Sequence, residues 1–306
     1  MARTFLQLIQ QAANEIGIPQ PTQLFGSQQE TAIQLIALAN REAKEFSAVA
    51  NKNGGWQDLH EEYSFETQIL TVTGDVTEGS AVVTNLSSVS GLSSEWGISS
   101  GQFRNASRIL TVDSPTQVTM DNPSTVTGTG VTIIFGRAAY PLPSNFEYFV
   151  EKTFWDNRYR WELIGPITAQ EKQILKYGVI ASGPRNKFYV RKNMMWLDPI
   201  PASVFKIAYD YYSNSPISTS TGSFSQTWTS DNDTYLLDED CFIQGMKWRF
   251  LRAKGLDYIE EYDAYEGDVS RTISRDGGSR DLPLGDNLRR IHFLNGGNIP
   301  DTGYGQ

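Results

Sequence analysis

The sequence has 306 residues, of which 39% are hydrophobic and 12% aromatic, so it can form two domains or one domain with an insertion and is not intrinsically disordered. Its net charge of −9 argues against a coat for nucleic acid, because binding to phosphates requires a basic surface. A single cysteine, Cys241, excludes an internal disulfide framework, and no apolar run is long enough to predict contact with a membrane.

Residues 1–64 have helical periodicity, and we expect them to form the first half of a helical body. Phe5–Ile16 carries one apolar stripe and ends before Gly17. The pattern Ser27-Gln-Gln-Glu30 predicts a capping box at the start of a second helix. Steps of four and three residues along this helix form a heptad seam, whose alanines allow another helix to come close. The seam contains Ala32, Ile36, Ala39, Ala43 and Phe46 and faces either the first helix or a second copy of the chain.

The composition changes abruptly over residues 65–138, where Thr, Ser, Val and Gly dominate and lysine is almost absent. Short runs of β-forming residues alternate there with turn signals. They are Ile69–Val72, Ala81–Thr84, Ile109–Val112, Gln117–Met120 and Val131–Phe135. We interpret this stretch as a small all-β module, a barrel or a sandwich, inserted into the helical body.

Residues 139–270 are predicted to complete the helical body. Capping-box patterns start helices at Ser144 and Thr168. The runs Phe188–Leu197 and Val204–Tyr212, on either side of a proline-rich turn, predict an antiparallel β-hairpin.

A long helix of about 30 residues is predicted to follow, from Leu237 to about Glu266. Basic residues precede acidic ones along it, and acids near a helix C-terminus oppose the macrodipole. We therefore interpret the charged residues as contacts with neighbouring subunits, as we do the alanine seam. The charged set is Lys247, Arg249, Arg252, Glu260 and Glu261.

Residues 271–306 have no periodic pattern, and we expect an extended C-terminal arm. The fold class predicted is therefore α+β, with a helical bundle body, an antiparallel β-hairpin, an inserted all-β barrel or sandwich, and this arm. As a hypothesis, the arm docks on another protein through its apolar residues. These are Ile273, Leu282, Leu284, Ile291, Phe293 and Leu294.

No catalytic, metal-binding or cofactor-binding constellation is predicted. Gly97-Ile-Ser-Ser-Gly101 matches the string of a nucleophile elbow, but it lies in the β module rather than between a strand and a helix. Asp231-Asn-Asp233 lacks the later ligands of a calcium loop. His60-Glu-Glu lacks the second histidine of a zinc protease motif.

The densest basic patch is interleaved with aromatic residues. It contains Arg158, Tyr159, Arg160, Trp161 and Arg191. Such mixtures bind nucleic acid in some proteins and form protein interfaces in others. We favour a protein interface and leave contact with DNA open.

Several short strings recur here in a characteristic order: Ala12–Gln20, Ala39–Ala43, Gly55-Trp-Gln57, Phe146–Val150, Trp155–Arg158 and Leu163–Ala169. Through their order and spacing, the chain resembles the head-to-tail adaptors of short-tailed bacteriophages, also called tail tubular or tail accessory proteins. The strings Gly74–Thr77, Asp113–Thr119 and Thr127–Thr132 make residues 76–136 look like a module that recurs as an insertion in phage structural proteins.

The resemblance implies a structural protein of the virion neck, assembled in the host bacterial cytoplasm, and not an enzyme. Such adaptors form a twelve-fold ring between the portal and the tail nozzle. The ring retains the packaged genome, supports the tail nozzle and fibres, and lets double-stranded DNA pass without reading its sequence. Given this resemblance, our hypothesis for the arm is that it docks on the portal, and we expect a mainly monomeric chain until it meets the portal.

Two other functions remain open at this stage. One is a tail-associated hydrolase of the host cell wall, which would need a carboxylate pair in a cleft. The other is a tail component that binds carbohydrate or a receptor through the β module, with Trp96 and Phe103 as its stacking residues.

Overall fold

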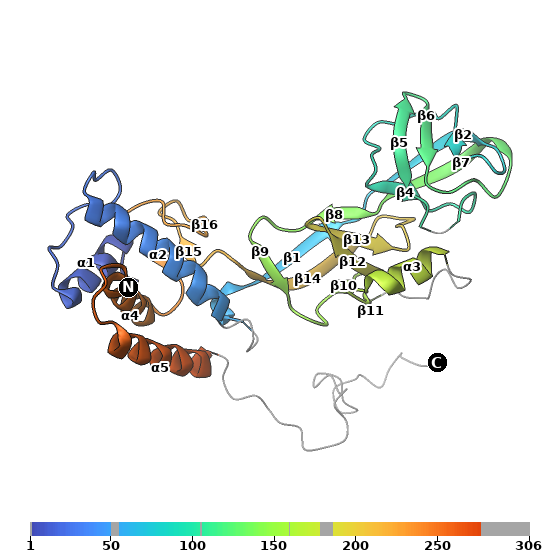
Figure 1. The fold of residues 1–306 in the computed structure, drawn as a ribbon. Helices are drawn as coiled ribbons and strands as arrows, with labels where there is room; N and C mark the ends of the chain where they lie inside the picture. Colours follow the sequence, from blue (N-terminus) through green and yellow to red (C-terminus); the bar gives the residue numbers. More distant parts are fainter. Residues whose placement is uncertain (1, 50–54, 105, 159, 178–185, 277–306) are drawn as a thin grey trace, which may run out of the picture.

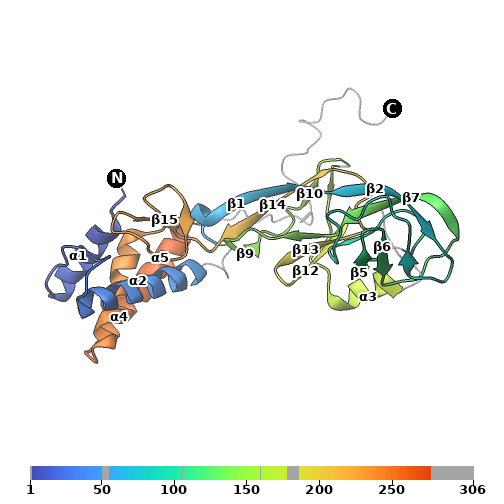
Figure 2. The same ribbon diagram turned by 90° about the horizontal axis from the view of Figure 1, so that it is seen from above.

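The chain is elongated, with helices at one end, a β-sheet in the middle and the β module at the other end (Figures 1 and 2). This is a computed structural model, and it describes residues 2–49, 55–104, 106–158, 160–177 and 186–276. The described residues form three hydrophobic cores, one in each of these three parts.

The helical end consists of α1 (Phe5–Ile16), α2 (Glu30–Val49), α4 (Glu239–Ala253) and α5 (Ile259–Asp276). The helices α1, α2 and α5 all contact α4. Thr4 forms a capping box with Gln7 at the start of α1, and Gly17, with φ +81°, ends the helix. The predicted capping box at Ser27 does not form, because α2 begins only at Glu30.

Small strands and two tryptophans complete the core of the helical end. The strands are β15 (Ile217–Ser218), β16 (Phe224–Ser225) and β17 (Thr234–Tyr235). Trp228 stacks on Phe5, with ring centroids 4.1 Å apart, and Trp56 stacks on Phe46 at 4.9 Å. Trp56 immediately precedes a short 3-10 helix, Gln57–Leu59.

The middle of the molecule is built around β14 (Lys206–Ser213), which pairs with β1 (His60–Glu66), β9 (Phe146–Phe149) and β10 (Trp155–Asp156). β11 (Trp161–Glu162) pairs with β10 and completes this five-stranded antiparallel sheet. A second sheet contains β12 (Lys187–Arg191), β13 (Met194–Asp198) and β8 (Ala139–Pro141). The predicted capping box at Thr168 forms at the start of α3 (Ala169–Tyr177), where Thr168 and Glu171 exchange hydrogen bonds.

The β module contains two three-stranded sheets around one apolar core. One sheet is β2 (Ile69–Val76), β7 (Gly128–Arg137) and β4 (Trp96–Ile98); the other is β3 (Val82–Val83), β6 (Gln117–Met120) and β5 (Ile109–Ser114). Each of the five β-type runs predicted from the sequence overlaps one of β2, β3, β5, β6 and β7. Phe65 lies in β1, where it stacks on Tyr140, and therefore belongs to the middle of the molecule rather than to the module.

The predicted helical bundle body is wrong. The fold is mixed, with 29% helix and 32% strand arranged in small antiparallel sheets. In the string Phe146–Val150, predicted as part of a helix, Phe146–Phe149 instead forms β9, whose Tyr148 pairs with Tyr212 of β14. The aromatic core formed with β14 outweighs the local capping-box signal there.

The β-hairpin also forms between strands other than those predicted. β12 and β13 turn at Lys192 and Asn193, which have φ values of 53° and 55°. Two consecutive residues with positive φ are typical of a two-residue hairpin turn. The two predicted runs therefore do not pair with each other: Phe188–Leu197 forms its own hairpin, and β14 pairs with β1.

The predicted long helix is interrupted after Ala253. Gly255 has φ +70°, and the Leu256 N–H donates to the Leu251 carbonyl at 3.0 Å, which closes a glycine C-cap. The chain then turns back as α5, which packs on α4. Because α5 continues to Asp276, residues 271–276 of the predicted arm are helical.

Candidate interaction surfaces

The alanine seam of α2 lies inside the chain. Ala32, Ala39, Ala43 and Phe46 are at most 1% exposed, and Ile36 packs at the margin of the same core. Because α2 contacts α4, the seam is occupied within the chain and is not available to a second copy.

Most of the charged residues predicted at subunit contacts also have partners within the chain. Lys247 Nζ lies 3.1 Å from Glu261 and 3.2 Å from Glu15. Arg249 is buried between α4 and α2. Arg252 and Glu260 are exposed, and they lie near the turn between α4 and α5. These two remain available for a contact between chains.

A buried carboxylate joins α2 to α4 and α5. Glu42 is 0% exposed, and Arg249 donates to it from α4. The Tyr265 hydroxyl donates to the other Glu42 oxygen at 2.8 Å from α5. Burial raises the pKa of Glu42, against the opposing attraction of Arg249. The three helices are therefore fixed to one another around a satisfied polar group, which makes the surface they carry well defined.

That surface contains a groove of about 810 Å³ between the end of α2 and α5. We call it the aromatic groove. Trp248 lines it and meets Tyr262 edge to face, with ring centroids 5.1 Å apart. Exposed apolar residues also line it, since Ile259 is 64% exposed and Val49 is 40% exposed. The lining residues used below are Val49, Trp248, Tyr258, Ile259, Tyr262 and Ile273.

Acidic and basic side chains border the aromatic groove. Glu45 and Glu266 line it, and the Tyr262 hydroxyl donates to Glu266 at 2.5 Å. The Arg252 guanidinium lies over the Tyr258 ring at 5.9 Å from its centroid. Trp, Tyr and Arg in one concave site are the residue types that contribute most to protein contacts.

The basic–aromatic patch centres on the hairpin formed by β10 and β11. Trp155 and Trp161 are 43% and 45% exposed. Buried Asp156 holds the hairpin tip by accepting the Arg158 N–H at 2.7 Å. Arg160 lies in the same turn with φ 54°. Arg191 is on β12 of the other sheet, and Tyr159 lies outside the described residues.

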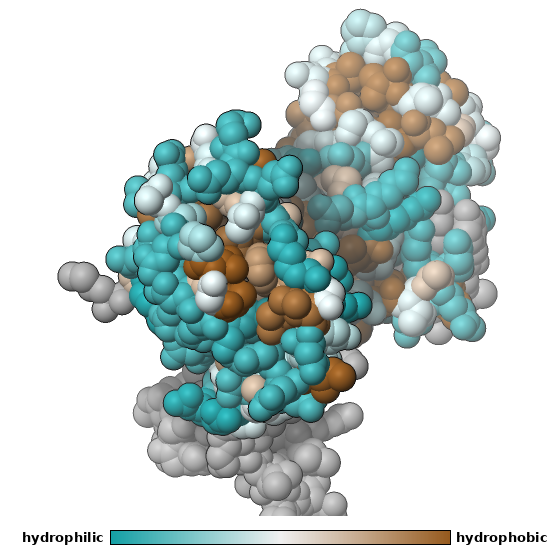
Figure 3. All heavy atoms as spheres, turned by 60° about the vertical axis from the view of Figure 1, so that its left-hand side comes forward, coloured by the Kyte–Doolittle hydropathy of each residue, from teal (hydrophilic) through white to brown (hydrophobic). Residues whose placement is uncertain are grey.

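A third apolar surface is on the β module. Leu110 and Val112 of β5 are 59% and 41% exposed, and Val126 is 43% exposed. Figure 3 shows a broad hydrophobic area on the module and a smaller one on the near face of the helical end.

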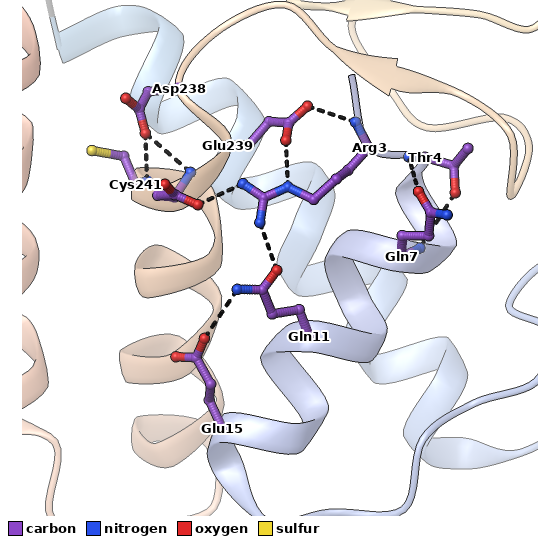
Figure 4. Close-up of polar contacts among 9 residues, drawn as sticks. Arg3, Thr4, Gln7, Gln11, Glu15, Asp238, Glu239 and Cys241 are labelled. Carbon is purple, nitrogen blue, oxygen red and sulfur yellow. Dashed lines mark hydrogen bonds and ion pairs between the residues drawn. The ribbon is translucent and has the colours of Figure 1, made fainter. Parts of the chain in front are cut away.

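The N-terminus is tied to the start of α4 by Arg3, which sequence reasoning missed (Figure 4). Its guanidinium pairs with Glu239 and Asp240, and these carboxylates raise the pKa of Arg3. It also donates to Gln11 of α1 at 2.5 Å. Because the partners are separated by 236 residues, no local pattern signals this contact.

The residues considered for catalysis or metal binding have structural partners. Ser99 donates to the Ile134 carbonyl at 3.2 Å, and His60 Nε2 lies 3.4 Å from Asp210. Asp233 accepts N–H groups of the loop before α4. Among the described residues, no cluster of three or more His, Cys, Asp or Glu is placed to hold a metal ion.

Of the six residues of the predicted docking arm, only Ile273 lies within the described residues. It is half-buried on α5 and packs against the core of the helical end. The other five lie outside the described residues. None of the described helices is both long and apolar enough to cross a membrane.

Comparison of the chain with protein-family models gives no match, and comparison with curated proteins gives no significantly similar sequence.

Proposed function

We propose that this chain is a structural virion protein, a head-to-tail adaptor of a short-tailed bacteriophage that forms a ring between the portal and the tail nozzle. The sequence strings shared with that family support the proposal through their order and spacing. Phe146–Phe149 forms a strand, so the proposal does not use the string Phe146–Val150 as a helical motif.

The observation that carries the proposal is the separation of three exposed apolar surfaces along an elongated chain. The aromatic groove is lined by residues of α2, α4 and α5. These helices form one end of the chain, whereas the β10–β11 hairpin lies in the middle and β5 on the distal module (Figure 1). Exposed apolar patches mark contacts with other molecules. Three such patches on one chain suit a protein that touches sister subunits and two other components of a tail.

In this proposal each part of the chain has a different neighbour. Sister subunits form the ring, expected to be twelve-fold, and the last apolar residues of the segment after Asp276, namely Ile291, Phe293 and Leu294, dock on the portal. The tail nozzle and fibres bind the other exposed surfaces. The net charge of −9 favours passage of double-stranded DNA through the ring without adhesion, since like charges repel.

A phage with an early nonsense codon in this gene tests the proposed function. We expect filled heads that lack tails and lose their DNA, with infectivity restored by the wild-type gene on a plasmid. Gold-labelled antibody against the chain should bind at the neck of wild-type particles. Normally tailed mutant particles, or label only on fibres, would contradict the proposal.

Two measurements on the purified chain complete the test. Light scattering is expected to give the mass of a monomer, and stable rings without a portal would count against the order of assembly proposed here.

A gel containing host cell wall is expected to show no clearing. Clearing would favour the hydrolase alternative.

A further inference from the structure

The aromatic groove has a concave, partly apolar surface, and the described residues leave its rim open. Ile259 and Val49 are both substantially exposed at this rim. The described residues leave these two side chains partly uncovered, although Trp248 in the same groove is buried. A covering segment would therefore bury apolar surface without rearranging the helices.

We propose that residues 279–286 of this chain lie in the aromatic groove of the same chain and run antiparallel to α5. The proposal concerns the chain by itself and stands whether or not the protein is an adaptor. Asp276 is the last residue that the structure describes, and residues 277–306 follow it in the sequence.

The point at which the segment leaves α5 favours this occupant. Ile273, in the last turn of α5, lines one end of the groove. Asp276 accepts the Gln57 N–H at 3.0 Å, which fixes the exit point beside the end of α2. Gly277 and Gly278 come next in the sequence, and glycines just after a helix permit the positive φ that reverses the chain.

The length of the segment matches the length of the groove. From Ile273 back to Ile259 is fourteen residues of α5, or about 21 Å at 1.5 Å per residue. An extended chain covers that distance in roughly six or seven residues at about 3.3 Å each. Starting at Ser279, the segment therefore reaches Ile259 near Leu284 or Gly285.

The sequence of the segment suits the walls of the groove. Arg280, Leu282 and Leu284 alternate, so an extended chain presents all three on one face. Pro283 keeps the preceding residue extended and disfavours a helix. The two leucines match the aromatic rings that line the groove, and Arg280 matches the carboxylate of Glu266, since Glu45 already pairs with Arg41 and Arg249.

Cross-linking of paired cysteines in the full chain tests the proposal. The test variant carries Ile259→Cys and Leu284→Cys, which place one cysteine in the groove and one on the segment proposed to lie in it. The matched control is Ile33→Cys with Leu284→Cys, because Ile33 is 54% exposed and lies about 24 Å along α2 from Val49. Single-cysteine variants measure any reaction of buried Cys241.

A short bismaleimide is expected to link Ile259→Cys to Leu284→Cys within one chain at least ten times faster than it links the control pair. Equal rates would overturn the proposal. Links between two chains would show that the groove takes the segment of a neighbour, and would overturn the placement within one chain. Peptide mapping by mass spectrometry distinguishes these products.

Two substitutions, each added to the Ile259→Cys/Leu284→Cys variant, distinguish specific docking from random encounter of the two cysteines. Leu282→Asp is expected to lower the rate to that of the control pair, because it places a charge against the aromatic rings that line the groove. Leu294→Asp makes the same change beyond the stretch that spans the groove and is expected to leave the rate unchanged. Equal effects of the two substitutions would also overturn the proposal.

Discussion

Gly245 of α4 lies directly against Glu42 of α2, so that a β-carbon at Gly245 would be 2.2 Å from a carboxylate oxygen of Glu42. This close approach allows the carboxylate to reach Arg249 and Tyr265 at the centre of the helical end. The absence of a side chain at position 245 is therefore a condition for joining α2, α4 and α5.

Gly245→Ala is expected to lower the free energy of unfolding by about 1–3 kcal/mol, because the added methyl group must displace a buried ion pair. Urea unfolding followed by circular dichroism measures the change. The control is Gly267→Ala in α5, where an added β-carbon meets nothing within 4 Å. It should raise stability by about 0.5–1 kcal/mol through helix propensity alone. Equal effects of the two substitutions would contradict the packing argument.

Glu42 should make the stability depend on pH. Its pKa is raised by burial above the usual 4.5, so the folded chain binds the proton more tightly than the unfolded chain. The stability it contributes is present below pH 4.5 and is lost as pH rises through the folded pKa. The free energy of unfolding of the wild-type chain, minus that of Glu42→Gln, should therefore decrease as pH rises above 4.5. A difference that rises over this range would reverse the assigned direction.

Gly255→Ala tests the turn between α4 and α5. Gly255 has φ +70° and an added β-carbon meets nothing within 4 Å, so the expected loss of about 1–2 kcal/mol comes from backbone strain alone. Gly255→Asn should lower the free energy of unfolding less, because Asn tolerates positive φ. If both variants match the wild-type in urea unfolding, the chain does not need this left-handed turn.

The same glycine explains one limit of prediction from the sequence. The periodicity of Phe242, Met246 and Phe250 correctly indicated a helix, and all three are buried. The Lys254-Gly255 pair was a recognisable C-cap signal, and using it would have predicted two helices. Where the second helix packs, and hence the aromatic groove, depends on contacts with α4 that no local pattern contains.

Strands were predictable where their pattern was local. The runs of the β module lie in strands because alternation and turn residues determine them locally. The partner of β14 was not predictable, since the residues of β1 pair with residues 140 to 152 positions later in the sequence. The turn at Lys192-Asn193 lacks the glycine that usually marks a two-residue hairpin, so the hairpin was assigned to the proline-rich turn instead.

Cys241 should be inert in the folded chain. It is buried, and burial raises its pKa to about 11, so little thiolate forms at pH 8. Reaction with a chromogenic disulfide reagent at pH 8 should be roughly 100-fold slower than in denaturant, where the pKa returns to about 8.5. Comparable rates in both conditions would show that the region around Cys241 opens readily.

Two truncations separate the role of the end of α5 from that of the segment after it. A chain that stops at Asp276 keeps Ile273 against the helical core and keeps the Asp276–Gln57 hydrogen bond. We expect it to stay folded. Its free energy of unfolding should fall by only about 1–2 kcal/mol, because Leu282 and Leu284 no longer cover the aromatic groove. A chain that stops at Arg271 loses both contacts.

The shorter chain should be less stable than the longer one by about 2–4 kcal/mol, because it uncovers the core and shortens α5. Thermal unfolding of the two truncated chains measures this difference. Binding to purified portal rings should be lost in both, although the longer chain remains folded. If the chain that stops at Asp276 binds portal rings as well as the full chain does, docking does not use residues 277–306, and the role proposed for Ile291, Phe293 and Leu294 is wrong.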